Sequence, residues 1–323
     1  MKRNVLSYIN LGLKGMAMGA ADVVPGVSGG TIAFISGIYE ELIRTIDQLD
    51  FGIIKLWRKS GFMHMFKTYN LNFLLMLFIG MLVSFISFAK LTEYLLKEHP
   101  VLIWAFFFGL VVASTIYIGK QVTSWNALKI LSIIIGGCIA YYITIAQPQA
   151  APSSWYFVLF SGFIAIIAMI LPGISGSFIL ILLGSYTVIL GTFNDFIQSL
   201  LERDFALLKV SFTRLFLFAI GCILGLKLFS KGLRWMFTHY KELTLALLTG
   251  FMIGSLNKIW PWKEVLTTRI DRHGEEVPLL EKSILPTSYE GDPQLVQAII
   301  LAILGFAIIL VLERLSRTRE HAN

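Results

Sequence analysis

The stretch PGVSGGTIAFISGIYEELI, residues 25–43, is the most informative part of the chain because it interrupts an apolar segment and occurs twice. Its second copy is PGISGSFILILLGSYTVIL, residues 172–190, which aligns without gaps at a distance of 147 residues. Seven of the nineteen positions are identical, including the helix-breaking proline and two glycines. Matched breaks at a constant spacing indicate an internal duplication, as in many transporters.

The duplication continues downstream at a spacing of 141 residues. Gly80 pairs with Gly221 and Gly109 with Gly250. The change in spacing falls within 44–70 and 191–211, which we expect to be loops of variable length. The sequence therefore predicts two related halves, residues 1–150 and 151–323.

The composition places the chain in a membrane. Of its 323 residues, 56% are hydrophobic and 15% are charged, whereas soluble domains carry about 25% charged residues. Residues 130–194 contain no charged side chain. The net charge of +7 comes from basic residues that flank apolar segments, a pattern of membrane topology rather than of nucleic-acid binding.

The spacing of apolar residues predicts an all-α polytopic membrane protein, because the alternation typical of a membrane barrel is missing from the sequence. Six apolar segments are expected to span the bilayer: 71–89, 101–119 and 130–146 in the first half, and 215–230, 243–257 and 294–312 in the second. Two further apolar regions, 5–43 and 155–190, contain the Pro-Gly breaks.

Lysine and arginine set the orientation. They are frequent near the N-terminus, in 44–70 and in the C-terminal tail, which we place in the cytoplasm. The uncharged turn at 147–154 and the insertion at 258–293 then lie outside. The first half makes an odd number of crossings, so the second half runs in the opposite direction, and the duplication is an inverted repeat. Both termini are expected in the cytoplasm.

The sequence leaves two arrangements of each broken region open. Each region is either two full spans or a re-entrant hairpin that enters and leaves on one side. Lys14, Asp22 and the short arms beside the break favour the re-entrant hairpin. Irregular backbone at membrane depth must be buried in protein or line a cavity.

The residues of the two breaks have predictable local roles. Proline ends the first arm and glycine permits the turn, which assigns the break to Pro25, Gly26, Pro172 and Gly173. The serines that follow are expected to cap the next arm. The first turn of that arm then presents free backbone N–H groups: those of Gly29, Gly30 and Thr31 in one copy, and of Gly176, Ser177 and Phe178 in the other.

Free N–H groups at a helix start suit a phosphate or a carboxylate. Inverted symmetry would bring the two starts together near the midplane as one anion site. The candidate binding residues are Ser28, Gly29, Gly30, Thr31, Ser175, Gly176 and Ser177. The competing interpretation is a pair of structural kinks packed by small residues.

Few charged residues lie near the breaks. Asp22 is a functional candidate because a carboxylate at membrane depth is costly. It can carry a coupling proton or pair with Lys14, and Met169 stands at its position in the second copy. Glu40 and Glu41 are candidates for gating, or simply a solvated helix end. Arg44 is a candidate for headgroup contact, or part of the same solvated helix end, and Arg214 is a candidate for lipid-phosphate contact, or for snorkelling to the membrane surface. These four candidates come from sequence position alone.

The segment GMAMGAADVVPGVSGGTIAFISGIYEELI, residues 15–43, with LPGISGSFILILLGSYTVIL at 171–190, resembles the PopT-type polyprenyl-phosphate transporters of bacteria. The resemblance covers most of the chain. It implies transport of undecaprenyl phosphate from the outer to the inner leaflet for cell-envelope synthesis. It also suggests that the headgroup crosses between the hairpins as one half rocks against the other, with the prenyl tail in lipid. The second copy departs from the family motif in two ways. Ser177 replaces the second glycine of the Gly-Gly pair, and no acidic residue precedes the break.

Two other function classes stay open. A transporter of small anions or ions could use the same architecture. An intramembrane serine hydrolase is the other, because Gly26 to Gly30 match G-x-S-x-G around Ser28. That hydrolase would need a histidine base at membrane depth, and all five histidines lie in loops, at span ends or in the tail. We expect no enzyme activity, metal or cofactor, apart from a coupling proton or sodium ion. A structural partner of cell-wall enzymes is a weaker alternative, and the sequence gives no oligomeric state.

Overall fold

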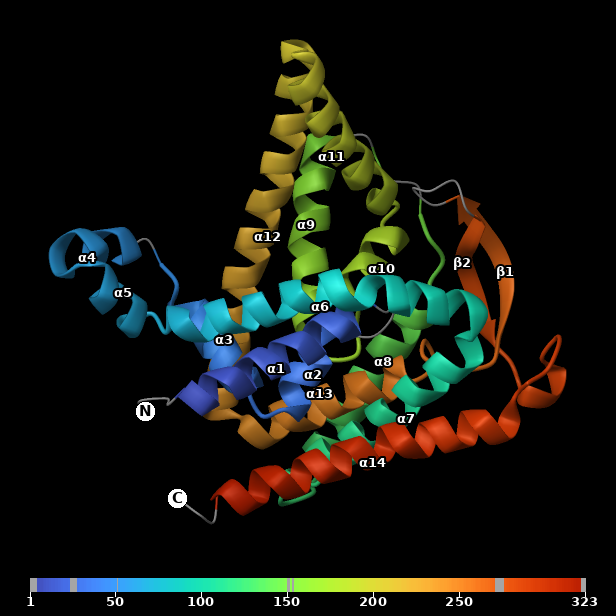
Figure 1. The fold of residues 1–323 in the computed structure, drawn as a ribbon. Helices are drawn as coiled ribbons and strands as arrows, with labels where there is room; N and C mark the ends of the chain where they lie inside the picture. Colours follow the sequence, from blue (N-terminus) through green and yellow to red (C-terminus); the bar gives the residue numbers. More distant parts are fainter. Residues whose placement is uncertain are drawn as a thin grey trace. The chain divides into compact units, whose positions relative to one another are not determined.

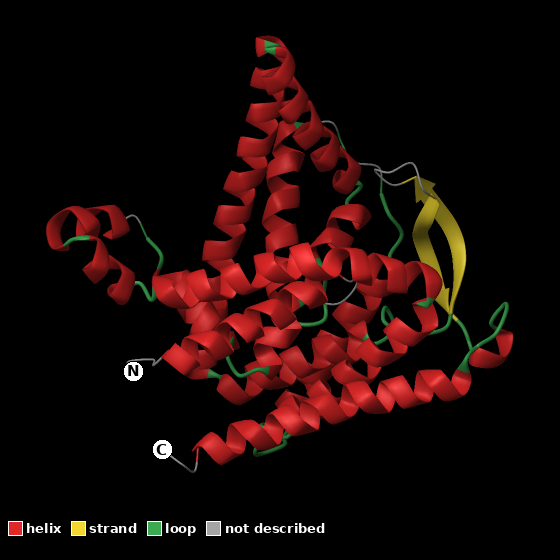
Figure 2. Cartoon of the chain, viewed as in Figure 1, coloured by secondary structure: helices red, strands yellow, loops and turns green. Residues whose placement is uncertain are grey.

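The computed structural model describes residues 5–23, 28–50, 52–149, 152, 154–270 and 276–320. Helices make up most of these residues, and one two-stranded hairpin interrupts them (Figure 2). The chain forms two compact units, and each combines pieces of both halves of the sequence. Unit 1 contains residues 1–85 and 148–241, and unit 2 contains residues 86–147 and 242–323.

Unit 1 contains both broken regions, each built as a long helix, a break, a seven-residue helix and a further helix (Figure 1). The first region comprises α1 (Val5–Val23), α2 (Gly29–Ile35) and α3 (Tyr39–Gln48). The second comprises α9 (Trp155–Ile170), α10 (Gly176–Leu182) and α11 (Ser185–Glu202). The short helices α2 and α10 begin 147 residues apart, as the sequence alignment requires.

The short helices also end in the same way. Gly37 has φ +72° and Gly184 has φ +67°, and these two glycines occupy equivalent positions of the two copies. Left-handed backbone is strained for residues with a Cβ atom. The glycines therefore allow the chain to turn sharply, and α10 and α11 meet at an angle of 105°.

In each copy the long first helix packs closely on a later helix: α1 on α6 (Leu71–Glu98), and α9 on α12 (Phe205–His239). A methyl group at Gly80 would strike the carbonyl oxygen of Gly12. A methyl group at Gly221 would strike that of Leu159, the residue equivalent to Gly12. Such close approach of backbones is typical of helix packing inside membranes.

Unit 2 contains α7 (Pro100–Gly119), α8 (Ala127–Ile145), α14 (Leu295–Glu320) and all but the first residue of α13 (Lys241–Ser255). Here a helix from one half of the sequence packs against a helix from the other half. The backbone at Gly109 of α7 lies against Ala302 of α14, and the equivalent Gly250 of α13 lies against Ile133 of α8. Each glycine leaves no room for a methyl group, so the same contact is made twice.

All six segments predicted to span the membrane are helical, with different boundaries. Within the described residues, four helices are long and apolar enough to cross a bilayer, namely α7, α8, α12 and the part of α6 from Leu71 to Phe88. The bent pair of α10 and α11 would add a fifth. The described apolar part of α14, Leu295–Val311, is shorter, and α13 has 15 residues.

Two expectations about connections were wrong. The predicted loop 44–70 contains α4 (Gly52–Ser60) and α5 (Phe62–Thr68), and the predicted loop 191–211 is occupied by α11 and the start of α12. The insertion 258–293, expected in an all-α protein, contains the hairpin of β1 (Lys263–Ile270) and β2 (Glu276–Ser283), followed by the 3₁₀ turn η1 (Pro286–Ser288). The chain is therefore mostly helical.

Candidate functional site

The start of α2 is capped by Ser28, as the sequence predicted. Ser28 has extended backbone, with φ −125° and ψ 133°, and its hydroxyl accepts the N–H of Gly30 at 3.1 Å. Its carbonyl oxygen accepts the N–H of Thr31 at 2.9 Å. These bonds satisfy two of the amides that every helix start leaves without an intrahelical partner.

The remaining amide of this turn is bound by Asp22. The carboxylate of Asp22 accepts the N–H of Gly29 at 2.6 Å. The expectation of free amides at Gly29, Gly30 and Thr31 was therefore wrong, because the protein supplies its own acceptors. A methyl group on Gly29 would lie 2.5 Å from the carboxylate, so glycine makes the approach possible. Lys14, the partner considered for Asp22, donates to the carbonyl oxygen of Ser36 at 2.5 Å.

The start of α10 has the same backbone but different chemistry. Ser175 has extended backbone, yet its hydroxyl bonds that of Ser177 at 2.9 Å instead of capping the helix, so that predicted cap was wrong. Met169 lies beside Gly176, where the first copy has Asp22 beside Gly29. Among the described residues, no acceptor meets the amides of Gly176 and Ser177.

The residues at the two helix starts also differ in how deeply they are buried. Ser28 and Thr31 are almost fully buried at 1% exposure each. Ser177 is exposed and Gly176 is partly exposed. The first helix start is therefore enclosed within the protein, whereas the second is partly exposed at Gly176 and Ser177 although Ser175 is buried.

The structure brings the two breaks into direct contact. The hydroxyl of Ser28 lies 3.2 Å from the carbonyl oxygen of Met169 and 3.4 Å from that of Leu171. The N–H of Gly173 donates to the hydroxyl of Thr31 at 2.9 Å. Because the last carbonyl groups of a helix have no intrahelical donor, the first break satisfies the end of α9.

Tyr39 completes this junction and was not among the predicted site residues. Its ring is 1% exposed and packs edge-on against Phe34 with centroids 4.9 Å apart. Its hydroxyl donates to the carbonyl oxygen of Ile170 at 3.1 Å. The signal was present in the sequence, because Tyr39 is one of the seven identical positions in the two copies and pairs with Tyr186.

The other predicted residues take different places. Glu40 forms an ion pair with Lys241 at 2.7 Å, and Glu41 accepts from the amide group of Asn70 at 2.9 Å. Arg44 and Arg214 are exposed on α3 and α12. Pro172 is buried and Gly173 has φ +86°, as a tight turn requires. The remaining two break residues, Pro25 and Gly26, lie outside the described residues.

Comparison with known proteins identifies the family. The profile of the undecaprenyl phosphate translocase-like family (VCA0040-like) matches residues 18–277, which include both breaks. The chain belongs to this family.

Within the part of the chain that the structure describes, no group of three or more His, Cys, Asp or Glu side chains is placed to hold a metal ion.

Two relatives are similar to this chain over most of their own length. The polyprenyl-phosphate transporter of Vibrio cholerae serotype O1 is 42% identical over 318 residues, which cover 97% of this chain and 99% of that protein. The polyprenyl-phosphate transporter of Staphylococcus aureus is 34% identical over 271 residues, which cover 79% of this chain and 86% of that protein. No solved structure matches the chain.

Proposed function

We propose that this protein is a transporter that moves polyprenyl phosphate across the cytoplasmic membrane, with undecaprenyl phosphate as its natural substrate. Its two relatives are polyprenyl-phosphate transporters, and its helices provide the apolar body that such a carrier needs. The observation that carries the proposal is the contact of the two breaks, where Ser28 and Thr31 meet residues 169–173. It concentrates polar backbone inside an apolar unit.

The phosphate group binds at the second break in this proposal. No acceptor among the described residues meets the amides of Gly176 and Ser177, and the bonded hydroxyls of Ser175 and Ser177 leave one hydroxyl proton to donate. Charge-assisted hydrogen bonds from such donors to phosphate are short and strong. The donors at Gly29, Gly30 and Thr31 become available only when their internal acceptors move away.

In this proposal, Asp22 controls when the phosphate group can bind during the transport cycle. Its carboxylate and a phosphate would compete for the same Gly29 amide. A proton or a sodium ion that neutralises Asp22 weakens its hold on this amide, which favours entry of the anionic headgroup. Transport is therefore coupled to the inward movement of that cation, and the lipid moves from the outer to the inner leaflet.

The proposal includes the membrane arrangement that the duplication and the positions of lysine and arginine predict. The breaks form re-entrant hairpins, the halves run in opposite directions, and both termini lie in the cytoplasm. The exposed Arg44 and Arg214 meet lipid phosphate at the two membrane surfaces, and Glu40 and Glu41 close the cytoplasmic end of α3. No catalytic step is assigned to Ser28, because its hydroxyl lies against backbone groups rather than a base.

The test is transport by the purified protein in liposomes that carry undecaprenyl phosphate in one leaflet. The double variant Ser175→Ala/Ser177→Ala should reduce the rate by about tenfold or more, by analogy with removal of positioned donors. Ser132→Ala is the matched control, because the hydroxyl of Ser132 bonds the carbonyl group of Leu128 in its own helix. An unchanged rate in the double variant would contradict the headgroup site.

The same liposomes test the alternative of a small-anion transporter. Inorganic phosphate and simple carboxylates, added as competitors, should leave lipid transport unaffected because they lack the prenyl chain. Uptake of labelled inorganic phosphate at a rate equal to that of the lipid would favour the alternative instead.

A further inference from the structure

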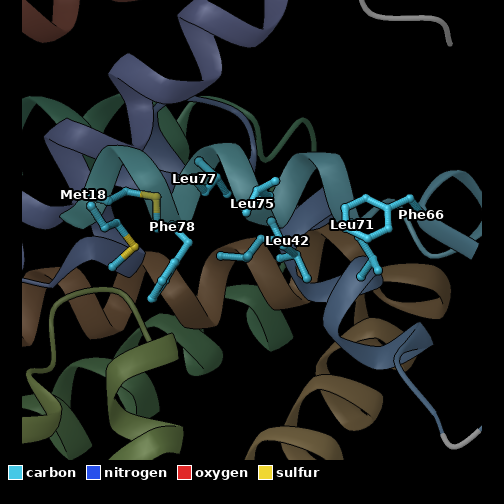
Figure 3. Close-up of a pocket in the computed structure, with 9 residues that line it drawn as sticks. Met18, Leu42, Phe66, Leu71, Leu75, Leu77 and Phe78 are labelled. Atoms are coloured by element: carbon cyan, nitrogen blue, oxygen red, sulfur yellow. The ribbon is translucent and has the colours of Figure 1, made fainter. Parts of the chain in front are cut away.

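An apolar groove lies on unit 1, between α1, α3, α5 and α6. Its volume is about 430 Å³, and the described residues that line it are methionines, leucines and phenylalanines. Figure 3 shows that it follows α6 from Leu71, beside Phe66, to Phe78, beside Met18.

We propose that this groove binds the part of the prenyl chain next to the phosphate, a conclusion that rests on the proposed function. The lining offers sulfur and hydrocarbon surface and no hydroxyl, amide or charged side chain. A headgroup would lose its hydrogen bonds there. The occupant must therefore be apolar along the whole groove, as an isoprenoid chain is.

The position of the groove connects it to the breaks. Met18 lines one end, and Asp22 follows it by four residues on α1. Residues four apart lie on the same helix face, one turn from each other. A chain that leaves the groove at Met18 therefore arrives one helical turn from the carboxylate that holds the amide of Gly29.

The size and composition of the groove also fit a methyl-branched chain. Ligand clefts commonly measure about 300–1,000 Å³, so a groove of about 430 Å³ accommodates a section of a long chain and leaves the rest in lipid. Met18 and Met81 line it together with leucines. Methionine is unbranched and polarizable, and it adapts to an irregular surface. The branches of an isoprenoid chain present such a surface.

Site-specific photocrosslinking tests the proposal directly. p-Benzoylphenylalanine replaces Phe78, which is 58% exposed and lines the groove, or Phe216 on α12, which is 55% exposed and does not line it. Each variant is reconstituted in vesicles of phosphatidylethanolamine, phosphatidylglycerol and undecaprenyl phosphate, and the adducts are identified by mass spectrometry. We expect undecaprenyl phosphate adducts to exceed phospholipid adducts at Phe78 by at least fivefold relative to Phe216. Equal ratios at the two positions would show an ordinary boundary lipid and overturn the proposal.

A groove-filling substitution supplies a second readout. Leu75→Trp fills the groove, whereas Leu224→Trp on α12 changes a leucine of the same 45% exposure elsewhere. Transport of undecaprenyl phosphate should fall at least fivefold in Leu75→Trp and stay unchanged in Leu224→Trp. If wild-type protein transports the lipid but both tryptophan variants are equally active, the groove assignment fails alone. If wild-type protein transports no lipid, the proposed function itself fails.

Discussion

The carboxylate of Asp22 lies 2.6 Å from the amide nitrogen of Gly29, at the helix start where a bound anion would otherwise lie. The second copy has Met169 in this place, beside Gly176. One duplicated framework thus provides a helix start with a built-in anion and a helix start without one. The two copies share their backbone form, and side chains such as Asp22 and Met169 make their chemistry different.

Substitution of Asp22 should separate its charge from its hydrogen bond. Asp22→Asn keeps an oxygen acceptor for Gly29, so its thermal stability should stay close to that of the wild type. Asp22→Ala removes the acceptor and should lower the free energy of unfolding by about 1.5–3 kcal/mol, as expected for bonds to charged groups. Both variants should lose the response of transport to a proton or sodium gradient, measured in liposomes.

Asp195→Asn, on α11, is the control for loss of one negative charge. If Asp22→Asn responded to both gradients as the wild type does, the coupling role of Asp22 would be wrong, whatever the stability of the protein.

The equivalent serines of the two breaks should respond differently to alanine. Ser28→Ala loses the cap of α2 and its contacts with residues 169 and 171, and caps of this kind contribute about 1 kcal/mol. Ser175 makes no capping bond, so Ser175→Ala should change the melting temperature less. Thermal unfolding of the detergent-solubilised variants measures the difference. Equal losses would mean that the caps are equivalent in solution.

Close helix packing should make two equivalent glycines intolerant of a methyl group. Gly80→Ala and Gly221→Ala each push a side chain into the backbone of the facing helix, so both should lower the melting temperature and the monodisperse yield. Gly232→Ala on the same α12 is the control, because nothing lies within 4 Å of its added methyl group. That variant should be neutral or more stable by up to about 1 kcal/mol, since alanine favours a helix. A greater loss in Gly232→Ala than in Gly221→Ala would contradict the packing argument.

The β hairpin provides a pH-dependent test outside the membrane-spanning helices. Burial lowers the pKa of Lys263 from 10.5 to about 8, although Glu281 lies 3.5 Å away and the ammonium group lies 3.6 Å from the centre of the Trp104 ring. Lys258 faces the same carboxylate at 3.2 Å. The folded state therefore binds fewer protons than the unfolded state between about pH 8 and 10.5, and stability attributable to Lys263 rises with pH in this window.

The measurement is the melting temperature of the wild type minus that of Lys263→Met, followed from pH 7 to pH 10. This difference should increase above about pH 8, where the wild type is relieved of its buried charge. Lys282→Met, at an exposed lysine of β2, is the control for loss of one positive charge from the hairpin. A difference that decreased above pH 8 for Lys263→Met would mean that its charge is stabilised in the folded protein.

The sequence was sufficient for the positions of most helices and of the two short helix starts. Apolar runs located a helix in each of the six predicted spans, and the alignment located Ser28 and Ser175 at the starts of α2 and α10. It was insufficient for segments whose structure depends on packing or on amphipathic balance. The helices α4 and α5 carry too many charged residues to be recognised as spans, and the hairpin of β1 and β2 lies in a polar insertion.

The polar partners were harder to predict than the elements. Sequence position identified Asp22 and Gly29 as candidates, yet it did not predict the hydrogen bond between the Asp22 carboxylate and the Gly29 amide. Likewise, the carbonyl oxygens that Ser28 and Tyr39 meet belong to apolar residues, Met169 and Ile170, whose side chains give no sign of the contact. Backbone acceptors are present at every residue, so the sequence cannot distinguish those that are used.

The junction of the breaks has a consequence for movement. A rocking motion of residues 1–150 against residues 151–323 would break the hydrogen bonds that Ser28, Thr31 and Tyr39 form with the end of α9 and the residues after it. Displacement of unit 1 as a whole would leave these bonds intact. The chain leaves or enters unit 1 at three points, after Phe85, before Pro148 and after Lys241. The two breaks therefore form one joined body within unit 1, and the two halves of the sequence cannot separate there without losing the hydrogen bonds at the end of α9.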